Sequence, residues 1–256
     1  SLGQVANSVN KIINSHVHIE NFYEMDKNKI SVNKENFIPN SKNLDSAITI
    51  KDLNFKYFNS EEYIFENLNL KVPKNAHTIL TGPNGSGKST LLGLIAGVFY
   101  SEKGTVETSS NKYGYIGAVP LIFYGTLREN LLYGNNANIE DEVIVDYLKE
   151  FKTFNEASGY DLDRTVDNKS LSSGQMQKIA FVRALLSDLE ILLLDESTAN
   201  LDDQSRDYIF DLLKSKKVTI INSTHDPEKF IEVDSYLHID IQGEKRFIID
   251  KNNLNS

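Results

Sequence analysis

Nine consecutive residues between a strand pattern and a helix pattern constrain the fold of this chain more than any other feature. They are Gly82, Pro83, Asn84, Gly85, Ser86, Gly87, Lys88, Ser89 and Thr90. Their spacing, G-x-x-x-x-G-K-[ST], is that of a loop whose backbone N–H groups and following helix N-terminus surround a phosphate. The sequence therefore predicts binding of a nucleoside triphosphate, with Lys88 on the outer phosphates and Ser89 as the first magnesium ligand.

Composition and charge narrow the classes of protein that this chain can represent. Its 256 residues are 40% hydrophobic and 25% charged, enough apolar material for one large core or two small ones. A formal net charge of −9 argues against nucleic acid as a primary partner, since phosphate binding needs clustered Lys and Arg. The absence of cysteine excludes disulfides and thiolate metal sites. Apolar runs such as 191–194 are far shorter than the roughly 20 residues that cross a bilayer.

The first 46 residues differ in character from the rest of the chain. They are rich in Asn, Ser and Lys, and the apolar residues at roughly helical spacing are Val5, Val9, Ile12, Ile13 and Val17. This pattern predicts one marginal helix followed by a linker, and a disordered tail is an equally good interpretation. A folded domain is expected over residues 47–250, with order beginning near Ile48.

Strand and helix patterns then alternate as in an α/β fold. Strand patterns cover 48–55, 68–72, 78–80, 104–106, 113–116, 189–195, 218–222 and 236–239, with an edge strand expected at 247–249. Helix patterns cover 91–95, 126–133, 139–151, 173–186, 203–213 and 227–233. The three helices in the middle have no strand pattern between them, which predicts a helical subdomain at about 126–187. The later alternation predicts a parallel sheet.

A second group of polar residues follows two of the predicted parallel strands. One apolar run ends in Asp195 and Glu196, and the next strand pattern is followed closely by His225. Parallel sheets bind ligands at the carboxyl ends of their strands. Asp195 can therefore reach the magnesium shell, Glu196 can accept a proton from the water that attacks the γ-phosphate, and His225 can donate a hydrogen bond to that phosphate. The alternative is a solvated acidic pair at a strand end.

A third group of small polar residues begins the helix predicted at 173–186. It consists of Ser172, Ser173, Gly174 and Gln175. A second helix N-terminus is a second candidate anion site. With these motifs in this order, residues from about 48 to 249 resemble the nucleotide-binding domain of the ATP-binding cassette (ABC) proteins. The signature of that family reads Leu-Ser-Gly-Gly-Gln, so Ser173 departs from it at the first glycine, while Ser172 and Gly174 remain.

The resemblance implies a fold, ligands and a partner. The fold is an α/β P-loop NTPase with a RecA-like core around a parallel sheet, an antiparallel β subdomain and an inserted α-helical subdomain. The ligands are ATP and Mg²⁺, and ATP hydrolysis is coupled to transport. Two such domains pack head to tail, as a homodimer or a heterodimer, so that Ser172, Ser173, Gly174 and Gln175 act on the nucleotide held by the partner's phosphate loop.

The resemblance also assigns roles to residues outside these motifs. Tyr57 is similar to the aromatic residue that stacks on adenine, and Tyr63 is a weaker candidate for the same role. The segment from Ser197 to Asp202 resembles the loop that communicates between the two nucleotide sites. These assignments predict that segments far apart in the sequence meet around one nucleotide.

One position breaks the family pattern. Where the family has a glutamine that contacts magnesium, this chain has Ala118, and no glutamine occurs between Gln4 and Gln175. Three interpretations stay open: hydrolysis is coupled to movement differently, the ATP site is slow, or a neighbouring residue compensates. The departure predicts a weakened magnesium dependence of nucleotide-driven dimerisation.

The segment 123–130 is similar to exporters of the family, in which a membrane domain usually precedes the nucleotide-binding domain in one polypeptide. The helix pattern at 2–17 would then be the cytosolic end of the last transmembrane helix, at the cytoplasmic face of the cell membrane. Partners would be a second nucleotide-binding domain and the transmembrane domain, and not nucleic acid. Two other functions stay open, a soluble ABC ATPase and an ATP-gated regulatory clamp with little turnover. The resemblance implies that the membrane part selects the transported substrate.

Overall fold

The structure, a computed structural model, describes residues 34–42, 44–58, 60–135, 138–154, 159–243 and 245–250. The chain divides into two units, Ser1–Lys34 and Glu35–Ser256. The helix predicted at 2–17 lies outside the described residues. Apart from Lys34, which begins a 3-10 turn η1 (Lys34–Asn36), all described residues belong to the second unit.

A six-stranded sheet forms the framework of the second unit. In spatial order its strands are β12 (Lys245–Asp250), β11 (Ser235–Gln242), β4 (His77–Thr81), β10 (Thr219–Ser223), β9 (Ile191–Asp195) and β6 (Tyr113–Ile116). Neighbouring strands are parallel throughout, except that β12 pairs antiparallel with β11 at the edge. The predicted parallel sheet and the edge strand near 247–249 are confirmed.

Both faces of this sheet are buried, which explains why β9 is an unbroken apolar run. Because successive side chains point to opposite faces, Leu193 joins one hydrophobic core while Leu192 and Leu194 join another. The first core includes helix α2 (Lys88–Ile95), and the second includes helices α5 (Ser173–Leu186) and α6 (Asp203–Ser215). Two cores therefore share one sheet.

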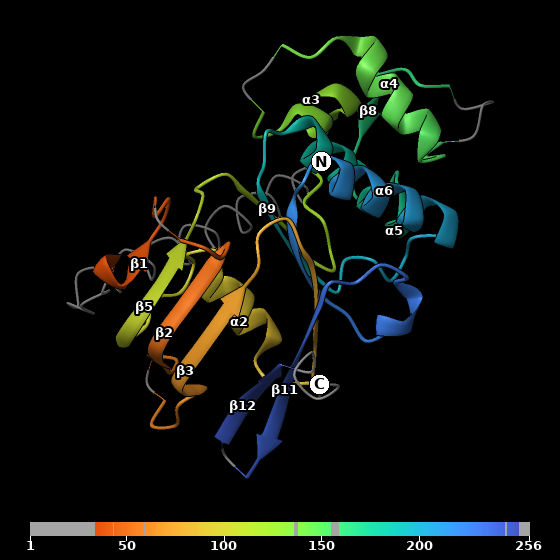
Figure 1. Cartoon of the computed structure of the whole chain (residues 1–256). Coiled ribbons are helices and arrows are strands. Elements are labelled where there is room, and N and C mark those ends of the chain that lie inside the picture. The colour runs from red at the N-terminus through yellow and green to blue at the C-terminus, as the bar shows by residue number, and fades with distance from the viewer. Residues whose placement is uncertain are drawn as a thin grey trace, which may run out of the picture. The chain divides into compact units, whose positions relative to one another are not determined.

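A four-stranded sheet closes the core that contains α2. Its order is β1 (Phe37–Ile38), β5 (Lys103–Thr108), β2 (Ile48–Phe55) and β3 (Phe65–Val72), and β2 is antiparallel to both of its neighbours (Figure 1). The expected antiparallel β subdomain is therefore present. β1 pairs parallel with β5 and lies in the stretch 1–46 that the sequence assigns to a helix and linker. The sheet begins earlier than expected because a two-residue strand has no detectable alternation.

Three helices form the inserted helical part of the unit. They are α3 (Leu127–Leu132), α4 (Asp141–Glu150) and α5, and α5 packs against both of the others (Figure 1). The prediction that no strand lies between them is wrong, because β7 (Gly125–Thr126) pairs antiparallel with β8 (Thr165–Val166). These strands of two residues are also too short for a period of two to show in the sequence.

The prediction of a helix at 227–233 is also wrong. The structure has only a 3-10 turn, η3 (Pro227–Lys229). Beyond it, Phe230 packs edge-on against His77 and Phe210, and the Asp234 carboxylate accepts the backbone N–H of His77 at 2.8 Å. These tertiary contacts hold the chain bent after residue 229 and override its weak helical pattern.

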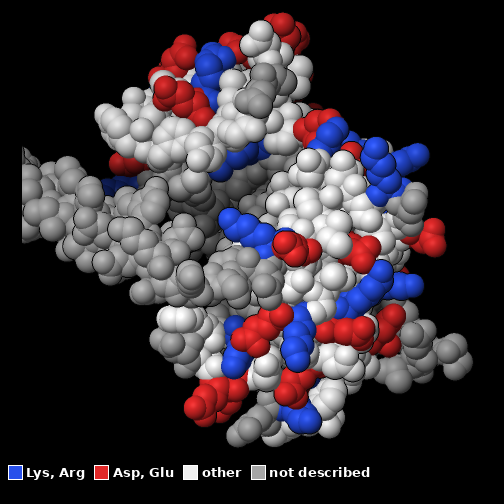
Figure 2. All heavy atoms as spheres, turned by 90° about the vertical axis from the view of Figure 1, so that its left-hand side faces the viewer, with Lys and Arg blue, Asp and Glu red and all other residues white. Residues whose placement is uncertain are grey.

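Charged side chains of both signs are mixed on the surface of the four-stranded sheet. Lys51 on β2 pairs with Glu107 on β5 at 2.8 Å, and Figure 2 shows Lys and Arg interspersed with Asp and Glu on the face that it presents. Exposed pairs of this kind contribute little to stability. Within the described ranges, no helix has the length and apolar character that a bilayer crossing requires.

Candidate nucleotide-binding site

Four neighbouring strands end at one edge of the six-stranded sheet. β4, β10, β9 and β6 are mutually parallel, so their carboxyl ends meet there. The register places Ser223 at the end of β10 beside Leu80 of β4 and Asp195 of β9. The phosphate-loop motif follows β4, while Glu196 and His225 follow β9 and β10. The fold thus brings together the polar groups that the sequence places at three separate strand ends.

The loop between β4 and α2 has the backbone of a phosphate cradle. Gly85 and Gly87 adopt φ angles of 77° and 100°, in the region that favours glycine. Lys88 is buried, and its Nζ donates to the carbonyl oxygens of Gly82 and Pro83 at 2.9 and 3.3 Å. The ammonium group therefore lies across the loop, where an outer phosphate would be held.

Hydroxyl groups in the same loop fit a phosphate and its cation. Ser86 Oγ is buried and has no hydrogen-bond partner among the described residues. Ser89, in the first turn of α2, is exposed. An unpaired buried hydroxyl costs free energy unless a ligand or water pairs with it, which is consistent with a polar ligand here.

Tyr57 reaches the same loop from the end of β2. Its hydroxyl lies 2.6 Å from Thr90 Oγ1 in α2. The ring packs edge-on against Phe55 and Phe99, with centroids 5.2 and 5.7 Å apart, and 43% of the residue is exposed. The structure therefore holds an aromatic ring, partly open to solvent, beside the phosphate loop.

Tyr63 is less suited to stack on a base. The ammonium group of Lys56 lies 5.2 Å from its ring centroid, and its hydroxyl donates to Glu102 at 2.9 Å. This hydrogen bond, with some desolvation and the nearby negative charge of Glu102, raises the pKa of the phenol. Tyr57 remains the better candidate of the two.

Asp195 ends β9 with one carboxylate oxygen paired and the other unpaired. The hydroxyl of Tyr115 on β6 donates to Asp195 Oδ2 at 2.8 Å, while Oδ1 is buried without a partner among the described residues. Burial, together with this hydrogen bond, raises the pKa of the Tyr115 phenol, which therefore stays protonated at neutral pH. Asp195 Oδ1 is an oxygen ligand of the kind that magnesium prefers.

Glu196 and His225 lie next to each other beside this carboxylate. Glu196 has a φ angle of 54°, which is unusual for a residue other than glycine, and its N–H donates to the carbonyl of Ser223 at 3.0 Å. His225 Nε2 lies 2.9 Å from Glu196 Oε1. Both side chains border a cavity of about 170 Å³ that Ala118 and Asn200 also line. A carboxylate base and an imidazole thus meet where a small reactant can enter.

The N-terminus of α5 presents the third motif on an exposed surface. Ser172 Oγ accepts the N–H of Gln175 at 3.2 Å, and Gln175 Oε1 accepts the N–H of Ser172 at 2.9 Å, so the two residues form a capping box. A side chain at Gly174 would lie 3.0 Å from the carbonyl oxygen of Asn200, whereas Ser173 is exposed. Position 174 therefore favours glycine, whereas the exposed position 173 has room for a serine side chain.

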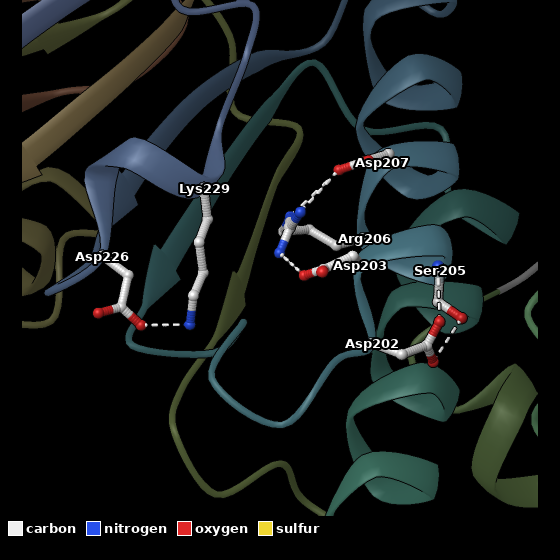
Figure 3. Close-up of polar contacts among 7 residues, drawn as sticks. All are labelled: Asp202, Asp203, Ser205, Arg206, Asp207, Asp226 and Lys229. Carbon is white, nitrogen blue, oxygen red and sulfur yellow. Dashed lines mark hydrogen bonds and ion pairs between the residues drawn. The ribbon is translucent and has the colours of Figure 1, made fainter.

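The loop between Glu196 and α6 contacts α5 as well as α6. Asp202 caps α6, accepting the Ser205 N–H at 2.9 Å (Figure 3), and it pairs with Lys178 of α5 at 2.7 Å. Burial opposes ionisation of Asp202, but hydrogen bonds from Lys178 and from the Ser205 N–H and hydroxyl lower its pKa to about 2. The loop is therefore fastened to α5 and α6 at neutral pH.

Two cations near His225 are already paired. Arg206 of α6 contacts Asp203 and Asp207, at 2.6 and 3.0 Å, and Lys229 contacts Asp226 at 2.6 Å (Figure 3). Both cations line the cavity beside Glu196. Because their charges are balanced locally, Lys88 remains the cation best placed for a phosphate.

The sequence reasoning missed two residues of the site. Tyr115 lies two residues before Gly117 on a predicted strand, and only the pairing of β6 with β9 reveals its contact with Asp195. Gln177 is buried in α5, where its amide oxygen accepts the Asn200 N–H at 3.1 Å and its amide nitrogen lies 3.5 Å from the Ala118 carbonyl oxygen. The sequence signal that could have located Gln177 was its position two residues after Gln175.

The fold and the arrangement of these motifs define a P-loop nucleotide-binding protein of the α/β class. Residues 65–199 match the family described as "ABC transporter". The chain is 32% identical over 204 residues to the ATP-dependent permease MDL1 of Candida albicans, covering 71% of this chain and 30% of that protein. It is 30% identical over 274 residues to the lactococcin-A transport/processing ATP-binding protein LcnC of Lactococcus lactis subsp. lactis, covering 95% of this chain and 36% of that protein.

The chain belongs to the ABC transporter family and is an ATPase domain of that family. A solved structure, a bacterial Atm1-family ABC exporter with ATP bound, superposes with a TM-score of 0.70 at 21% identity, covering 90% of this chain and 43% of that one. The predicted P-loop fold and the resemblance to ABC nucleotide-binding domains are confirmed. The chain spans about a third of the length of the two relatives described above.

Proposed function

We propose that this chain is the nucleotide-binding domain of a membrane exporter. Relatives named as a permease, as a transport ATP-binding protein and as an exporter support this assignment. The match to LcnC extends over 95% of the chain and so includes most of residues 1–46. In this proposal those residues connect the domain to a preceding transmembrane domain, and the ATPase domain works at the cytoplasmic face of the membrane.

The nucleotide would lie along the edge where β4, β10, β9 and β6 end. Tyr57 stacks on the base, the phosphate loop surrounds the phosphates, and Lys88 binds the outermost of them. Ser89 and Asp195 would hold Mg²⁺, which when bound neutralises charge on the phosphates. The unpaired Asp195 Oδ1 and the exposed Ser89 hydroxyl support this assignment.

Hydrolysis would depend on Glu196 and His225. Glu196 orients a water molecule and accepts its proton, and His225 donates a hydrogen bond to the transferred phosphate. The observation that carries this proposal is the convergence of the phosphate loop, Asp195 and the Glu196–His225 pair at one sheet edge. These groups lie at the ends of three strands, β4, β9 and β10, that are far apart in the sequence, so their convergence is a property of the fold and not of the sequence order.

The signature residues would act on the nucleotide of a second domain. Ser172, Gly174 and Gln175 line a groove of about 520 Å³ that contains no residue of the phosphate loop. Ser172 already accepts a hydrogen bond within its capping box, and its O–H can still donate to a phosphate. A head-to-tail pair of domains would therefore complete two sites.

Replacing Glu196 tests the hydrolytic role. The Glu196→Gln variant keeps the size of the side chain but cannot accept the proton, so phosphate release should fall by about 10²- to 10⁴-fold while ATP binding persists. The matched control is Glu190→Gln, an exposed residue just before the other end of β9, which should keep the wild-type rate. Equal rates for wild type and Glu196→Gln would remove Glu196 from this role.

The same measurement distinguishes a second candidate function. Ala118 brings no polar side chain to the cavity beside Glu196, which favours an ATP-gated clamp with little turnover. A clamp predicts that wild type already releases phosphate as slowly as Glu196→Gln, although both bind ATP. A fast wild-type rate contradicts the clamp.

A further inference from the structure

Tyr115 is the residue of this site whose contact no motif predicts. Its hydroxyl donates to Asp195 Oδ2 at 2.8 Å, and about half of the side chain remains exposed. The hydrogen bond spans two strands and joins residues that are 80 positions apart. It is therefore a product of sheet pairing.

The register of β6 against β9 places this tyrosine on the nucleotide side of the sheet. Tyr115 pairs with Leu193, and directly paired residues of parallel strands point to the same face. Leu193 faces the core that contains α2, the helix that begins at the phosphate loop. Asp195 lies two residues after Leu193 and so shares that face. The phenol thus approaches Asp195 from the side of α2.

The hydrogen bond from Tyr115 makes the two oxygens of the Asp195 carboxylate unequal. Oδ2 is held by the phenol, while Oδ1 is buried and has no partner among the described residues. A carboxylate fixed through one oxygen presents the other in a single orientation, which is how hydrogen-bonded neighbours orient metal ligands. Ala118, just after β6, brings no polar side chain that could do the same.

We propose that Tyr115 is a positioning residue that holds Asp195 so that its free oxygen faces the divalent cation of the nucleotide site. The inference depends on the proposed function, because it requires a cation at Asp195. Tyr115 acts through the carboxylate and not as a ligand. Under this proposal, Tyr115 on β6 is the neighbouring residue that compensates for the missing polar side chain at position 118.

The Tyr115→Phe variant removes only the hydroxyl. In the Glu196→Gln background, which blocks turnover, Mn²⁺ binding to the ATP complex is measured by electron paramagnetic resonance. We expect Tyr115→Phe to weaken Mn²⁺ about tenfold, as is common when the hydrogen-bonded support of a metal ligand is lost. ATP binding in EDTA and the melting temperature of the free chain should stay within error of the parent, which a purely structural role would not predict.

Tyr113 supplies a matched control. It lies two residues before Tyr115 on the same strand, so its side chain points to the same face but is further from Asp195. Its partner in the sheet is Ile191. Tyr113→Phe should leave the Mn²⁺ affinity unchanged. Equal weakening by Tyr113→Phe and Tyr115→Phe would overturn the inference, because a general effect on β6 would then explain both.

Asp195→Asn separates failure of the inference from failure of the proposed function. It should weaken Mn²⁺ strongly, and adding Tyr115→Phe to it should weaken Mn²⁺ no further, since the phenol acts through the carboxylate. If Asp195→Asn weakens Mn²⁺ but Tyr115→Phe does not, the inference is wrong and the nucleotide site stands. If Asp195→Asn has no effect and Lys88→Ala leaves ATP affinity unchanged, the proposed site itself is wrong.

Discussion

At the scale of single residues, His77 shows how burial changes the chemistry of one side chain. It lies at the start of β4, where its ring packs at a tilt against Phe210, with centroids 4.7 Å apart, and edge-on to Phe230 at 5.4 Å. Only 8% of the residue is exposed. Burial lowers the pKa of the imidazole from 6.5 to about 4, against the opposing effects of the Glu232 carbonyl and the Asp234 charge.

This pKa shift predicts a loss of stability on acidification. Above about pH 6.5 the imidazole is neutral in both states, but between pH 6.5 and 4 the unfolded chain binds a proton that the folded chain does not. The free energy of unfolding should therefore fall by about 3 kcal/mol across this range. His77→Phe keeps an aromatic ring and removes the titration, so its urea midpoint should change less over the same range. Parallel pH profiles for wild type and His77→Phe would contradict this account.

Single residues also show the limit of prediction from sequence for the site. The phosphate loop, Asp195, Glu196 and His225 could be located because each motif is contiguous or follows a recognisable strand. Tyr115 could not, because its role depends on which strand lies beside β9. A contact between strands is set by sheet order, which short-range patterns do not encode.

At the scale of elements, helices α3 and α5 begin with the same capping motif but differ in their proposed roles. Thr126 and Glu129 form a capping box at α3, as Ser172 and Gln175 do at α5. Each hydroxyl accepts a backbone N–H that the helix cannot satisfy by itself. The two caps are therefore matched in structure, and only that of α5 belongs to the proposed interface.

This pair separates the effect of a cap on folding from its effect on binding. Ser172→Ala and Thr126→Ala should each reduce the free energy of unfolding by about 1 kcal/mol, measured in urea. Only Ser172→Ala should also weaken ATP-dependent association, because only its hydroxyl would donate to the opposite nucleotide. If both variants weaken association equally, the role of Ser172 is limited to capping.

Most elements were predictable from the sequence. The failures share one cause, because each of these segments takes its structure from contacts with distant parts of the chain. Helices such as α5 and strands such as β9 are long enough for their periodicity to show. β1, β7 and β8 have two residues each and form only because a partner strand is present. The turn after Pro227 replaces a predicted helix because Phe230 packs on His77.

At the scale of the whole molecule, the proposed site is incomplete in one copy. No residue of the phosphate loop lines the groove at Ser172. ATP would therefore join two domains, with its phosphates between the polar surfaces. The chain should be largely monomeric without nucleotide.

Gel filtration with light scattering tests this expectation. Glu196→Gln should elute as a monomer without nucleotide and as a dimer at saturating ATP, with the dimer fraction rising with ATP concentration. Lys88→Ala, which lacks the cation at the phosphates, should stay monomeric under both conditions. The same dimer with and without ATP would show that nucleotide is not what holds the domains together.

The sequence by itself determined the phosphate loop, the acidic strand end, the order of most strands and helices, and the membership of the family. These features are local, since a motif or a periodic run carries its own physical signal within a few residues. The tertiary structure alone decided that Tyr115 contacts Asp195, that His77 is buried between aromatic rings, and that β1 joins the four-stranded sheet. Each of these depends on which segments pack side by side, and such packing is fixed only when the whole domain buries its two cores together.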